Sequence, residues 1–412
     1  MHIYILLVRI AALFGHKKAR LLLAGQKAAK EVMTAYAAVP VSDTSGDQRP
    51  KTIWFHAASV GEFEQARPLI EKLAGSNKQS KIIVTFFSPS GYEARKNYPL
   101  AEKVMYLPFA TRKNAKRFLD TFRPDIAIFI KYDFWPAYLR ELKKRDIPTY
   151  LVSGIFRKEQ LFFRWYGWWY RKLLECFTML FVQDEESAAL LERLSVTDYG
   201  LRVMIAGDTR FDRVAAINNN QSSINNQHLS AFAVGKVIVA GSTWHPDEVL
   251  LARYIEEHED VRLILVPHEI DEARLHDVFN TFQGRLVRFT EATDLNIRHV
   301  RVLVVDTMGM LSKLYRLGQA AYVGGGFGVG IHNTLEPAVY GMPVVFGHNY
   351  EHFREAKGLV ACGAGLPVSN YAEFEAAMDK ALSEHESLGA KATEYIQSEL
   401  GATDKILNNL TI

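Results

Sequence analysis

The fold is decided by residues 322–347, which read YVGGGFGVGIHNTLEPAVYGMPVVFG. A short apolar strand leads into a glycine-rich loop, and His332, Asn333 and Thr334 are predicted to begin a helix. Glycines let a backbone turn with positive φ, and the first N–H groups of a helix attract an anion. The stretch therefore predicts a strand-loop-helix unit of an α/β protein that binds a phosphate. A tight turn without a ligand is an equal alternative.

The common nucleotide-binding motifs are absent from this sequence. Gly324 and Gly326 begin a dinucleotide fingerprint, but Val329 stands where its third glycine belongs. No G-x-x-x-x-G-K-[ST] pattern occurs in the chain. The glycines thus predict neither a dinucleotide domain nor a phosphate-binding loop of the ATPase type.

Composition indicates two domains in a reduced compartment. The chain has 412 residues, of which 48% are hydrophobic, enough for two ordinary cores. Its formal net charge is +3 without a long lysine or arginine block, so no nucleic-acid partner is expected. Cys176 and Cys362 are far apart and lack metal-ligand spacing, which favours the cytoplasm.

Strands and helices alternate in both halves of the chain. Apolar runs typical of buried parallel strands occupy residues 52–55, 81–85, 126–130, 149–152, 179–182, 237–240, 263–266, 302–305 and 320–323. Residues 213–235 are polar, nearly uncharged and without apolar periodicity, as in a linker. The pattern predicts two doubly wound Rossmann-like domains facing an interdomain cleft, with ligands at the carboxyl ends of the strands.

Two segments favour contact with a membrane. Residues 3–14 are apolar apart from Arg9, and a basic flank of His16, Lys17, Lys18, Arg20, Lys27 and Lys30 follows. Residues 157–174, RKEQLFFRWYGWWYRKLL, interleave aromatic and basic side chains, as suits phosphate headgroups at a bilayer interface. The alternatives are helices packed on the N-terminal domain, or, for residues 157–174, single-stranded nucleic acid.

Polar residues follow several predicted strands. Ser59 and Glu62 follow the first strand and form either a capping box or, with Gly61 giving access, a general base at a ligand site. In the second half, Ser242 and Thr243 follow one strand and His268 the next, and Met308 and Gly309 follow a third. Singly these are ordinary caps or turns. Together they indicate a nucleotide pocket.

A series of short motifs occurs in the order and at the intervals typical of one protein family. They are 59–62 (SVGE), Thr85, 89–91 (PSG), 106–108 (YLP), 123–124 (RP), 135–136 (WP), 210–212 (RFD), 240–243 (AGST), 306–309 (DTMG), 324–325 (GG), 332–333 (HN), 335–337 (LEP) and 345–347 (VFG). Over nearly its whole length the chain resembles the 3-deoxy-D-manno-octulosonic acid (Kdo) transferases of lipopolysaccharide synthesis, inverting glycosyltransferases with the GT-B fold.

The resemblance implies a reaction. Glu62 would be the catalytic base that deprotonates a hydroxyl of a lipid A precursor (lipid IVA), which attacks the anomeric carbon of Kdo as CMP leaves. Arg210, where the family often has lysine, would steady the leaving phosphate. Residues 131–133 read Lys-Tyr-Asp where many members have Glu-Thr-Glu, so Asp133 is the candidate for the supporting carboxylate.

The resemblance also implies the substrate contacts. The residues expected to bind substrate are Ser59, Gly61, Ser242, Thr243, Pro267, His268, Met308, Gly309, Met310, Gly326, Gly330, His332, Asn333, Thr334, Leu335 and Glu336. His268 replaces a common arginine and Met310 a common glutamate. No D-x-D motif occurs, so neither a metal nor a cofactor is expected beside the donor substrate, CMP-Kdo.

The expected organisation has five parts. They are a membrane-associating segment (1–30), an acceptor-binding domain (31–212), a linker (213–235), a CMP-sugar-binding domain (236–390) and a C-terminal helix (391–412). The expected location is the cytoplasmic side of the inner membrane, with peripheral attachment or a single anchor. The alternatives are another GT-B enzyme, such as a UDP-sugar transferase or an epimerase, and a membrane-docked nucleotide-binding protein.

Overall fold

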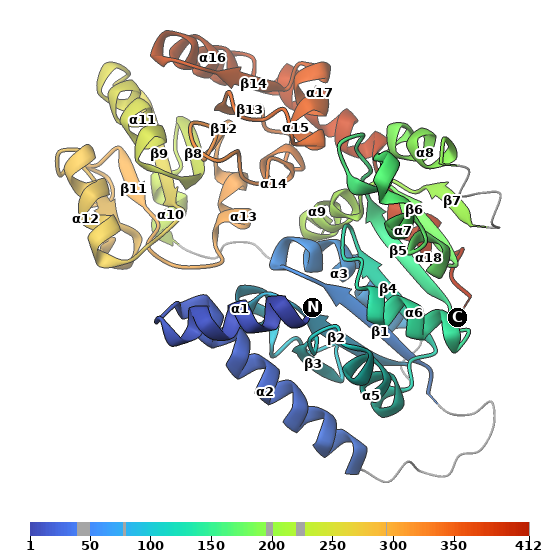
Figure 1. Cartoon of the computed structure of the whole chain (residues 1–412). Helices are drawn as coiled ribbons and strands as arrows, with labels where there is room; N and C mark the ends of the chain where they lie inside the picture. Colours follow the sequence, from blue (N-terminus) through green and yellow to red (C-terminus); the bar gives the residue numbers. More distant parts are fainter. Residues whose placement is uncertain (39–49, 77–79, 195–200, 220–226, 294, 412) are drawn as a thin grey trace. The chain divides into compact units, whose positions relative to one another are not determined.

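The computed structural model describes residues 1–38, 50–76, 80–194, 201–219, 227–293 and 295–411, and the chain divides into two α/β units (Figure 1). Unit 1 consists of Met1–Arg213 with Leu400–Ile412, and unit 2 of Val214–Glu399. Within the described residues, each unit contains one seven-stranded parallel sheet. The predicted pair of doubly wound domains is therefore confirmed.

The sheet of unit 1 has the order β3-β2-β1-β4-β5-β6-β7. Its strands are β1 Thr52–Ala57, β2 Lys81–Phe86, β3 Lys103–Tyr106, β4 Ile126–Ile130, β5 Thr149–Gly154, β6 Met179–Val182 and β7 Arg202–Ile205. Alternate side chains of β1 point to opposite faces, so Trp54 joins one hydrophobic cluster and Ile53 and Phe55 join another. Both faces are covered, which is why these strands read as continuous apolar runs.

Helices of unit 1 flank this sheet. They are α1 His2–Leu13, α2 Lys17–Ala38, α3 Val60–Ser76, α4 Pro89–Arg95, α5 Arg112–Phe122, α6 Pro136–Lys144, α7 Trp168–Arg171, α8 Glu185–Glu192, α9 Thr209–Asn219, which crosses into unit 2, and α18 Ala402–Leu407. Short 3₁₀ turns occupy Leu161–Phe163, Trp165–Gly167 and Leu174–Cys176.

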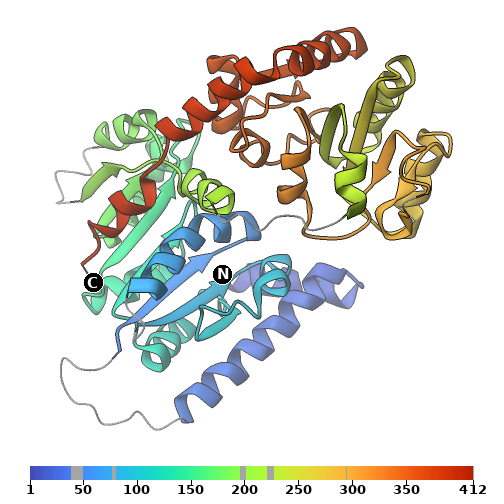
Figure 2. The same cartoon turned by 180° about the vertical axis from the view of Figure 1, so that it is seen from behind.

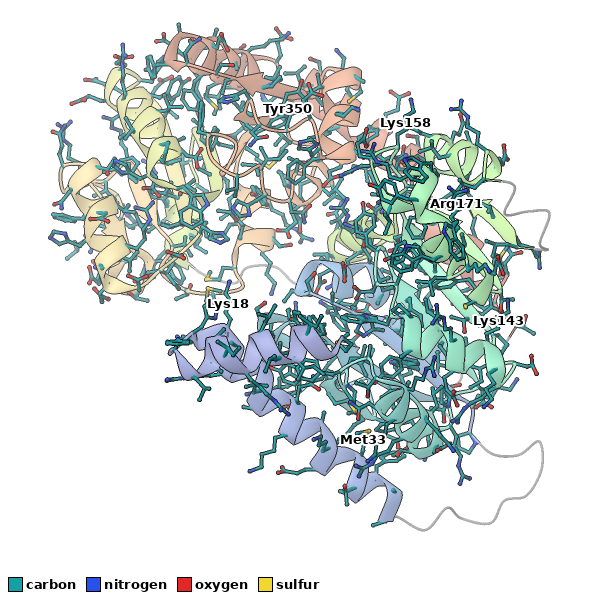
Figure 3. The ribbon with its side chains drawn as sticks, viewed as in Figure 1. Lys18, Met33, Lys143, Lys158, Arg171 and Tyr350 are labelled. Carbon is teal, nitrogen blue, oxygen red and sulfur yellow. The ribbon has the colours of Figure 1, made fainter. Side chains whose placement is uncertain are left out.

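Helix α2 packs against the N-terminal sheet and belongs to unit 1. Met33 is buried and turned toward the body of the unit (Figure 3). The amide of Gln26 donates to the carbonyl of Leu107 over 2.9 Å and accepts the N–H of Phe109 over 2.8 Å. The boundary expected after residue 30 is therefore wrong, because α2 is continuous to Ala38. Among the described residues, no helix has both the length and the apolar character needed to cross a bilayer.

The end of the chain returns to unit 1 (Figure 2). The carboxylate of Asp212 accepts the N–H of Gly401 over 2.7 Å, and the N–H and hydroxyl of Thr403, each over 2.6 Å. A single helix over 391–412 was expected. Instead α17 ends at Ser398, and Gly401, with φ of 99°, separates it from α18, because a left-handed residue interrupts the helix.

The sheet of unit 2 has the order β10-β11-β9-β8-β12-β13-β14. Its strands are β8 Lys236–Thr243, β9 Val261–Pro267, β10 Val287–Arg288, β11 Val302–Val304, β12 Ala320–Val323, β13 Val344–Gly347 and β14 Gly365–Val368. Its helices are α10 Gln227–Phe232, α11 His245–Glu257, α12 Glu272–Thr281, α13 Leu311–Leu314, α14 Leu335–Ala338, α15 Arg354–Cys362, α16 Tyr371–Ser383 and α17 His385–Ser398, with 3₁₀ turns at Phe289–Glu291 and Tyr315–Leu317.

The segment expected as a polar linker is partly helical. Helix α9 runs to Asn219, and α10 buries Leu229 and Phe232 completely against unit 2. These two apolar side chains anchor a stretch whose composition otherwise suggests no packing. Residues 220–226 of the expected linker lie outside the described residues.

Candidate functional site

Glu62 lies in the first turn of α3, directly after the carboxyl end of β1. Its Oε2 accepts the N–H of Ala58 over 2.5 Å, and its own N–H faces Oγ of Ser59 at 3.4 Å. The carboxylate therefore caps the first turn of α3 and also lies at the carboxyl end of β1. A Cβ on Gly61 would meet no described atom within 4 Å, so internal packing does not require this glycine.

The environment of Glu62 favours its protonated form. Burial raises the pKa of Glu62, and the charge of Asp133 raises it further, while the N–H of Ala58, His56 and Lys131 lower it in part. A carboxylate with a raised pKa is a stronger base than one in water. The structure thus brings Glu62 and Asp133, both singled out in the sequence, into electrostatic contact.

A buried histidine joins this carboxylate pair. His56 is fully buried on β1, and its Nε2 lies 2.9 Å from Oδ2 of Asp133. Its Nδ1 lies 2.8 Å from Oγ1 of Thr85 on β2, and Nε1 of Trp135 lies 2.9 Å from its Nε2. His56 was not among the residues predicted to form the site. The available signal was an imidazole inside a fully buried strand whose other residues, apart from Thr52, are apolar.

Arg210 belongs to a separate polar cluster of unit 1. Its guanidinium contacts the buried carboxylate of Asp208, with Nη2 at 2.7 Å and Nε at 2.8 Å from Oδ2. Burial alone would raise the pKa of Asp208, but the charge and hydrogen bonds of Arg210 hold it below its usual value. Gln65 of α3 donates to the same carboxylate over 3.1 Å. The positive charge expected to face a phosphate is thus already beside a negative one.

In unit 2, the end of β8 combines strain with internal hydrogen bonding. Ser242 has a φ of 54°, which is unusual for a residue other than glycine. The hydroxyl of Thr243 is buried and donates to Oε1 of Glu248 over 2.9 Å, and Glu248 also contacts Arg274 at 2.5 Å. The hydroxyl of Thr243 therefore donates within unit 2. Ser242, in contrast, is partly exposed.

Three aromatic rings cluster at the carboxyl edge of this sheet. The ring of His268, just after β9, lies 4.7 Å from that of Trp244 and 4.4 Å from that of His332. Nε1 of Trp244 donates to Nε2 of His332 over 3.3 Å. Burial, and then the neighbouring His268, lower the pKa of His332. His268 and His332 were expected to share a site, and Trp244 is a member that the sequence analysis missed.

The glycine-rich loop is packed against other backbone. A Cβ on Gly324 would come within 2.4 Å of the carbonyl oxygen of Ser242, and one on Gly326 within 2.6 Å of the backbone of Gly347. Gly330, with φ of 136°, lies against the ring of Phe353. These glycines are therefore required by close contacts within unit 2, whatever ligand the loop binds.

The helix expected after this loop is a single turn. Helix α14 covers only Leu335–Ala338, so the expectation of a full helix with a dipole at Asn333 is wrong, since the chain turns back into β13 at once. Asn333 donates to Oε1 of Glu336 over 3.0 Å and accepts the N–H of Leu335 over 3.1 Å. The buried hydroxyl oxygen of Thr334 has no hydrogen-bond partner among the described residues.

The remaining predicted residues lie near the same strand ends. Pro267 ends β9, and Met308 is 80% exposed in the loop after β11. Gly309 has a φ of 82°, and Oγ1 of Thr307 lies 2.9 Å from the sulfur of Met310. Across the described ranges, no group of three His, Cys, Asp or Glu residues could hold a metal ion.

Part of the chain matches a known protein family. Residues 27–213 match the family described as 3-Deoxy-D-manno-octulosonic-acid transferase (kdotransferase). The chain is 26% identical over 339 residues to the 3-deoxy-D-manno-octulosonic acid transferase of Aquifex aeolicus, covering 80% of this chain and 86% of that one. It is 24% identical over 371 residues to a bifunctional glycosyltransferase/methyltransferase of Fusobacterium nucleatum, covering 87% of this chain but only 57% of that protein.

Solved structures support the architecture. The UDP-GlcNAc 2-epimerase of Neisseria meningitidis superposes with a TM-score of 0.61 over 87% of this chain and 98% of that one, at 15% identity. This likeness shows the two-domain α/β arrangement of the GT-B fold. Together, these comparisons support one interpretation: residues 27–213 form a Kdo transferase domain, and the chain is similar to Kdo transferases over most of its length.

Proposed function

We propose that this chain transfers Kdo from CMP-Kdo to a lipid A precursor (lipid IVA), with inversion and without a metal, and that Glu62 is the general base. The observation that carries this proposal is the half-buried Glu62 carboxylate, held at the carboxyl edge of β1 beside Asp133 in the part of the chain that matches the family. Two proteins named 3-deoxy-D-manno-octulosonic acid transferase are similar to this chain over 80% and 88% of its length.

The chemistry assigns a distinct task to each carboxylate. Glu62 takes the proton of an acceptor hydroxyl as its oxygen bonds to the anomeric carbon of Kdo. The bond between that carbon and the phosphate oxygen breaks, and CMP leaves with the electron pair. Positive charge develops on the sugar ring in such a transition state, and the negative charge of Asp133 stabilises it.

We assign CMP to unit 2. The cluster of Trp244, His268 and His332 offers aromatic faces beside a strand end. Thr334 adds a buried hydroxyl oxygen that has no hydrogen-bond partner among the described residues. Arg210 remains the candidate for steadying the leaving phosphate. Asp208 offsets part of its charge and holds its guanidinium in one position.

We further propose that unit 1 docks on the cytoplasmic face of the inner membrane. Helix α1 exposes large apolar side chains, including Leu13 (82% exposed), and Lys18 lies in the first turn of α2, which follows (Figure 3). In the aromatic-basic segment (residues 157–174), Trp165 is 86% exposed, and Lys158 and Arg171 supply positive charge. Exposed aromatic rings beside basic groups suit an anionic lipid surface.

The decisive test removes the base without removing the fold. We expect Glu62→Gln to lower kcat for transfer from CMP-Kdo to lipid IVA by roughly 10²- to 10⁴-fold, the usual contribution of a general base. Glu186→Gln, which changes another first-turn carboxylate at a strand end in unit 1, is the matched control and should keep the wild-type rate. A folded Glu62→Gln enzyme with near wild-type turnover would refute the mechanism.

Calorimetric titration with CMP and UDP separates the alternatives. Preferential binding of UDP would support another GT-B enzyme. The likeness to the UDP-GlcNAc 2-epimerase shows the fold alone and does not decide between the two nucleotides. Affinity for CMP without turnover of CMP-Kdo would support a membrane-docked nucleotide-binding protein. Preferential binding of CMP together with transfer supports the proposal.

A further inference from the structure

His56 is a buried titratable group to which the proposed mechanism gives no role. Its side chain is fully buried, and the rings of Phe129 and Trp135 pack around it at 5.7 and 6.2 Å between centroids. An imidazole in such a place must satisfy both of its nitrogens with neighbours. Those neighbours determine which nitrogen carries the proton.

The neighbours of Nδ1 favour a proton on the other nitrogen. Nε1 of Trp54, which can only donate, donates to Oγ1 of Thr85 over 2.8 Å. The hydroxyl proton of Thr85 can then go to Nδ1 of His56 at 2.8 Å or to the carbonyl of Phe55 at 3.4 Å. The shorter contact is the better hydrogen bond. Nδ1 therefore accepts, and a neutral imidazole carries its proton on Nε2.

Two groups compete for Nε2. Oδ2 of Asp133 and Nε1 of Trp135 each lie 2.9 Å from it. The indole can only donate, so it is satisfied there only when Nε2 has no proton. Oδ2 of Asp133 is buried and forms no hydrogen bond with the described residues, although Nε2 of His56 lies within ion-pair distance of it. Because an unsatisfied buried carboxylate oxygen costs more than an unsatisfied indole N–H, the Nε2–H donates to Asp133 while Asp133 is ionised.

We propose that His56 is a positioning residue that donates from Nε2 to Asp133 and so keeps a second negative charge beside Glu62. This inference rests on the proposed function, because it gives that charge a use in transfer. The groups that face the carboxylate pair are His56 of β1, Lys131 and Tyr132 of the loop after β4, and Tyr170 of α7. The hydroxyl of Thr85 acts indirectly, because it determines which ring nitrogen of His56 carries the proton.

The consequence is a particular pH dependence. The proposed reaction needs Glu62 ionised, and burial and the charge of Asp133 raise the pKa of Glu62. Without a donor at the position of Nε2, the charge of Asp133 acts on Glu62 unopposed and raises the pKa of Glu62 further. The acid limb of kcat then moves to higher pH, by roughly one unit for the loss of such a donor.

Two substitutions at His56 separate this role from packing. The amide of glutamine reaches toward the position of Nε2, so His56→Gln retains a donor for Asp133. The amide of asparagine reaches only toward Nδ1, so His56→Asn retains a group near Thr85 and loses that donor. We expect His56→Asn to shift the acid limb upward by roughly one unit and His56→Gln to stay near wild type. Equal limbs in the two variants would overturn the proposal.

Nitrogen NMR of histidine-labelled protein tests the proton position without any turnover. His56 is identified by the resonance that the His56→Gln variant loses, and we expect a neutral ring protonated at Nε2. Thr85→Val should make the Nδ1–H form appear, whereas Thr85→Ser keeps the hydroxyl and the wild-type tautomer. A wild-type His56 protonated at Nδ1 would contradict the inference. If the wild-type protein fails to use CMP-Kdo, the proposed function is wrong. The NMR measurement still shows which nitrogen of His56 carries the proton.

Discussion

The hydroxyl of Tyr322 donates to Oδ1 of Asp247 over 2.7 Å, deep in unit 2. The other carboxylate oxygen accepts the N–H of Gly325 over 3.0 Å and that of Trp244 over 2.9 Å. Burial raises the pKa of Asp247, and these hydrogen bonds oppose the increase. One carboxylate thus ties the end of β12, the first turn of the glycine-rich loop and the start of α11 together.

We expect Asp247→Ala to lower the free energy of unfolding by about 3 kcal/mol, because it leaves three donors without their acceptor. Tyr322→Phe removes only one of these hydrogen bonds and should cost about 1 kcal/mol. Urea denaturation measures both, and CMP titration should show weaker binding for Asp247→Ala. Equal costs for the two variants would mean that the backbone N–H groups do not depend on Asp247.

The glycine-rich loop offers a matched pair of substitutions. A Cβ at Gly326 would lie 2.6 Å from backbone atoms of Gly347, whereas one at Gly328 would meet only the carbonyl of Gly325 at 3.6 Å. We expect Gly326→Ala to lower the free energy of unfolding by about 1–3 kcal/mol through overpacking. Gly328→Ala should remain near wild type in thermal unfolding. Comparable losses in both would contradict the packing account of these glycines.

Glu62→Gln should separate stability from activity. Because burial and Asp133 raise the pKa of Glu62, its ionised form costs stability in the folded state. That cost is absent below the unfolded pKa of about 4.3 and complete above the folded value. Wild type should therefore lose stability relative to Glu62→Gln as pH rises through the folded pKa, and become the less stable of the two at pH 7.

Unfolding of both proteins from pH 4 to pH 8 checks this sign. The difference between the two unfolding free energies isolates Glu62 from the other titrating groups. A wild type that gained stability relative to the glutamine variant with rising pH would mean that the ionised carboxylate is stabilised in the fold.

The aromatic-basic segment should govern binding to lipid. We expect Trp165→Ser with Trp168→Ser to reduce co-sedimentation with vesicles containing anionic phosphatidylglycerol by about tenfold or more, because two exposed rings no longer enter the interface. Thermal stability should hardly change, since both rings are exposed. Leu295→Ser in unit 2 removes an equally exposed apolar side chain and serves as the control. Unchanged vesicle binding by the double variant would show that the aromatic-basic segment does not mediate binding to lipid.

The sequence predicted best the strands that the sheets bury on both faces. Expected strands at residues 52–55, 126–130 and 179–182 correspond to β1, β4 and β6, since central parallel strands must be apolar throughout. Strand β7, Arg202–Ile205, escaped notice because it is an edge strand with exposed ends and a polar first residue.

The site was only partly predictable, because its contacts join distant residues. The first-turn position and helix-capping potential of Glu62 follow from its neighbours in sequence. In contrast, His56 reaches Thr85 across 29 residues and Asp133 across the sheet, and neither spacing follows from a local pattern. For the glycine-rich loop, a glycine needed by a ligand and one needed by neighbouring backbone look the same in sequence. The packing of Gly326 on Gly347 separates the two only in the folded unit.

The discontinuous chain of unit 1 imposes an order on biosynthesis. Residues Val214–Glu399 form one unbroken stretch and can fold as soon as they leave the ribosome. Asp212 emerges before them, yet it obtains its partners only when Gly401 and Thr403 have been made. The unit that is translated first is therefore completed last, after the whole of unit 2 has been translated.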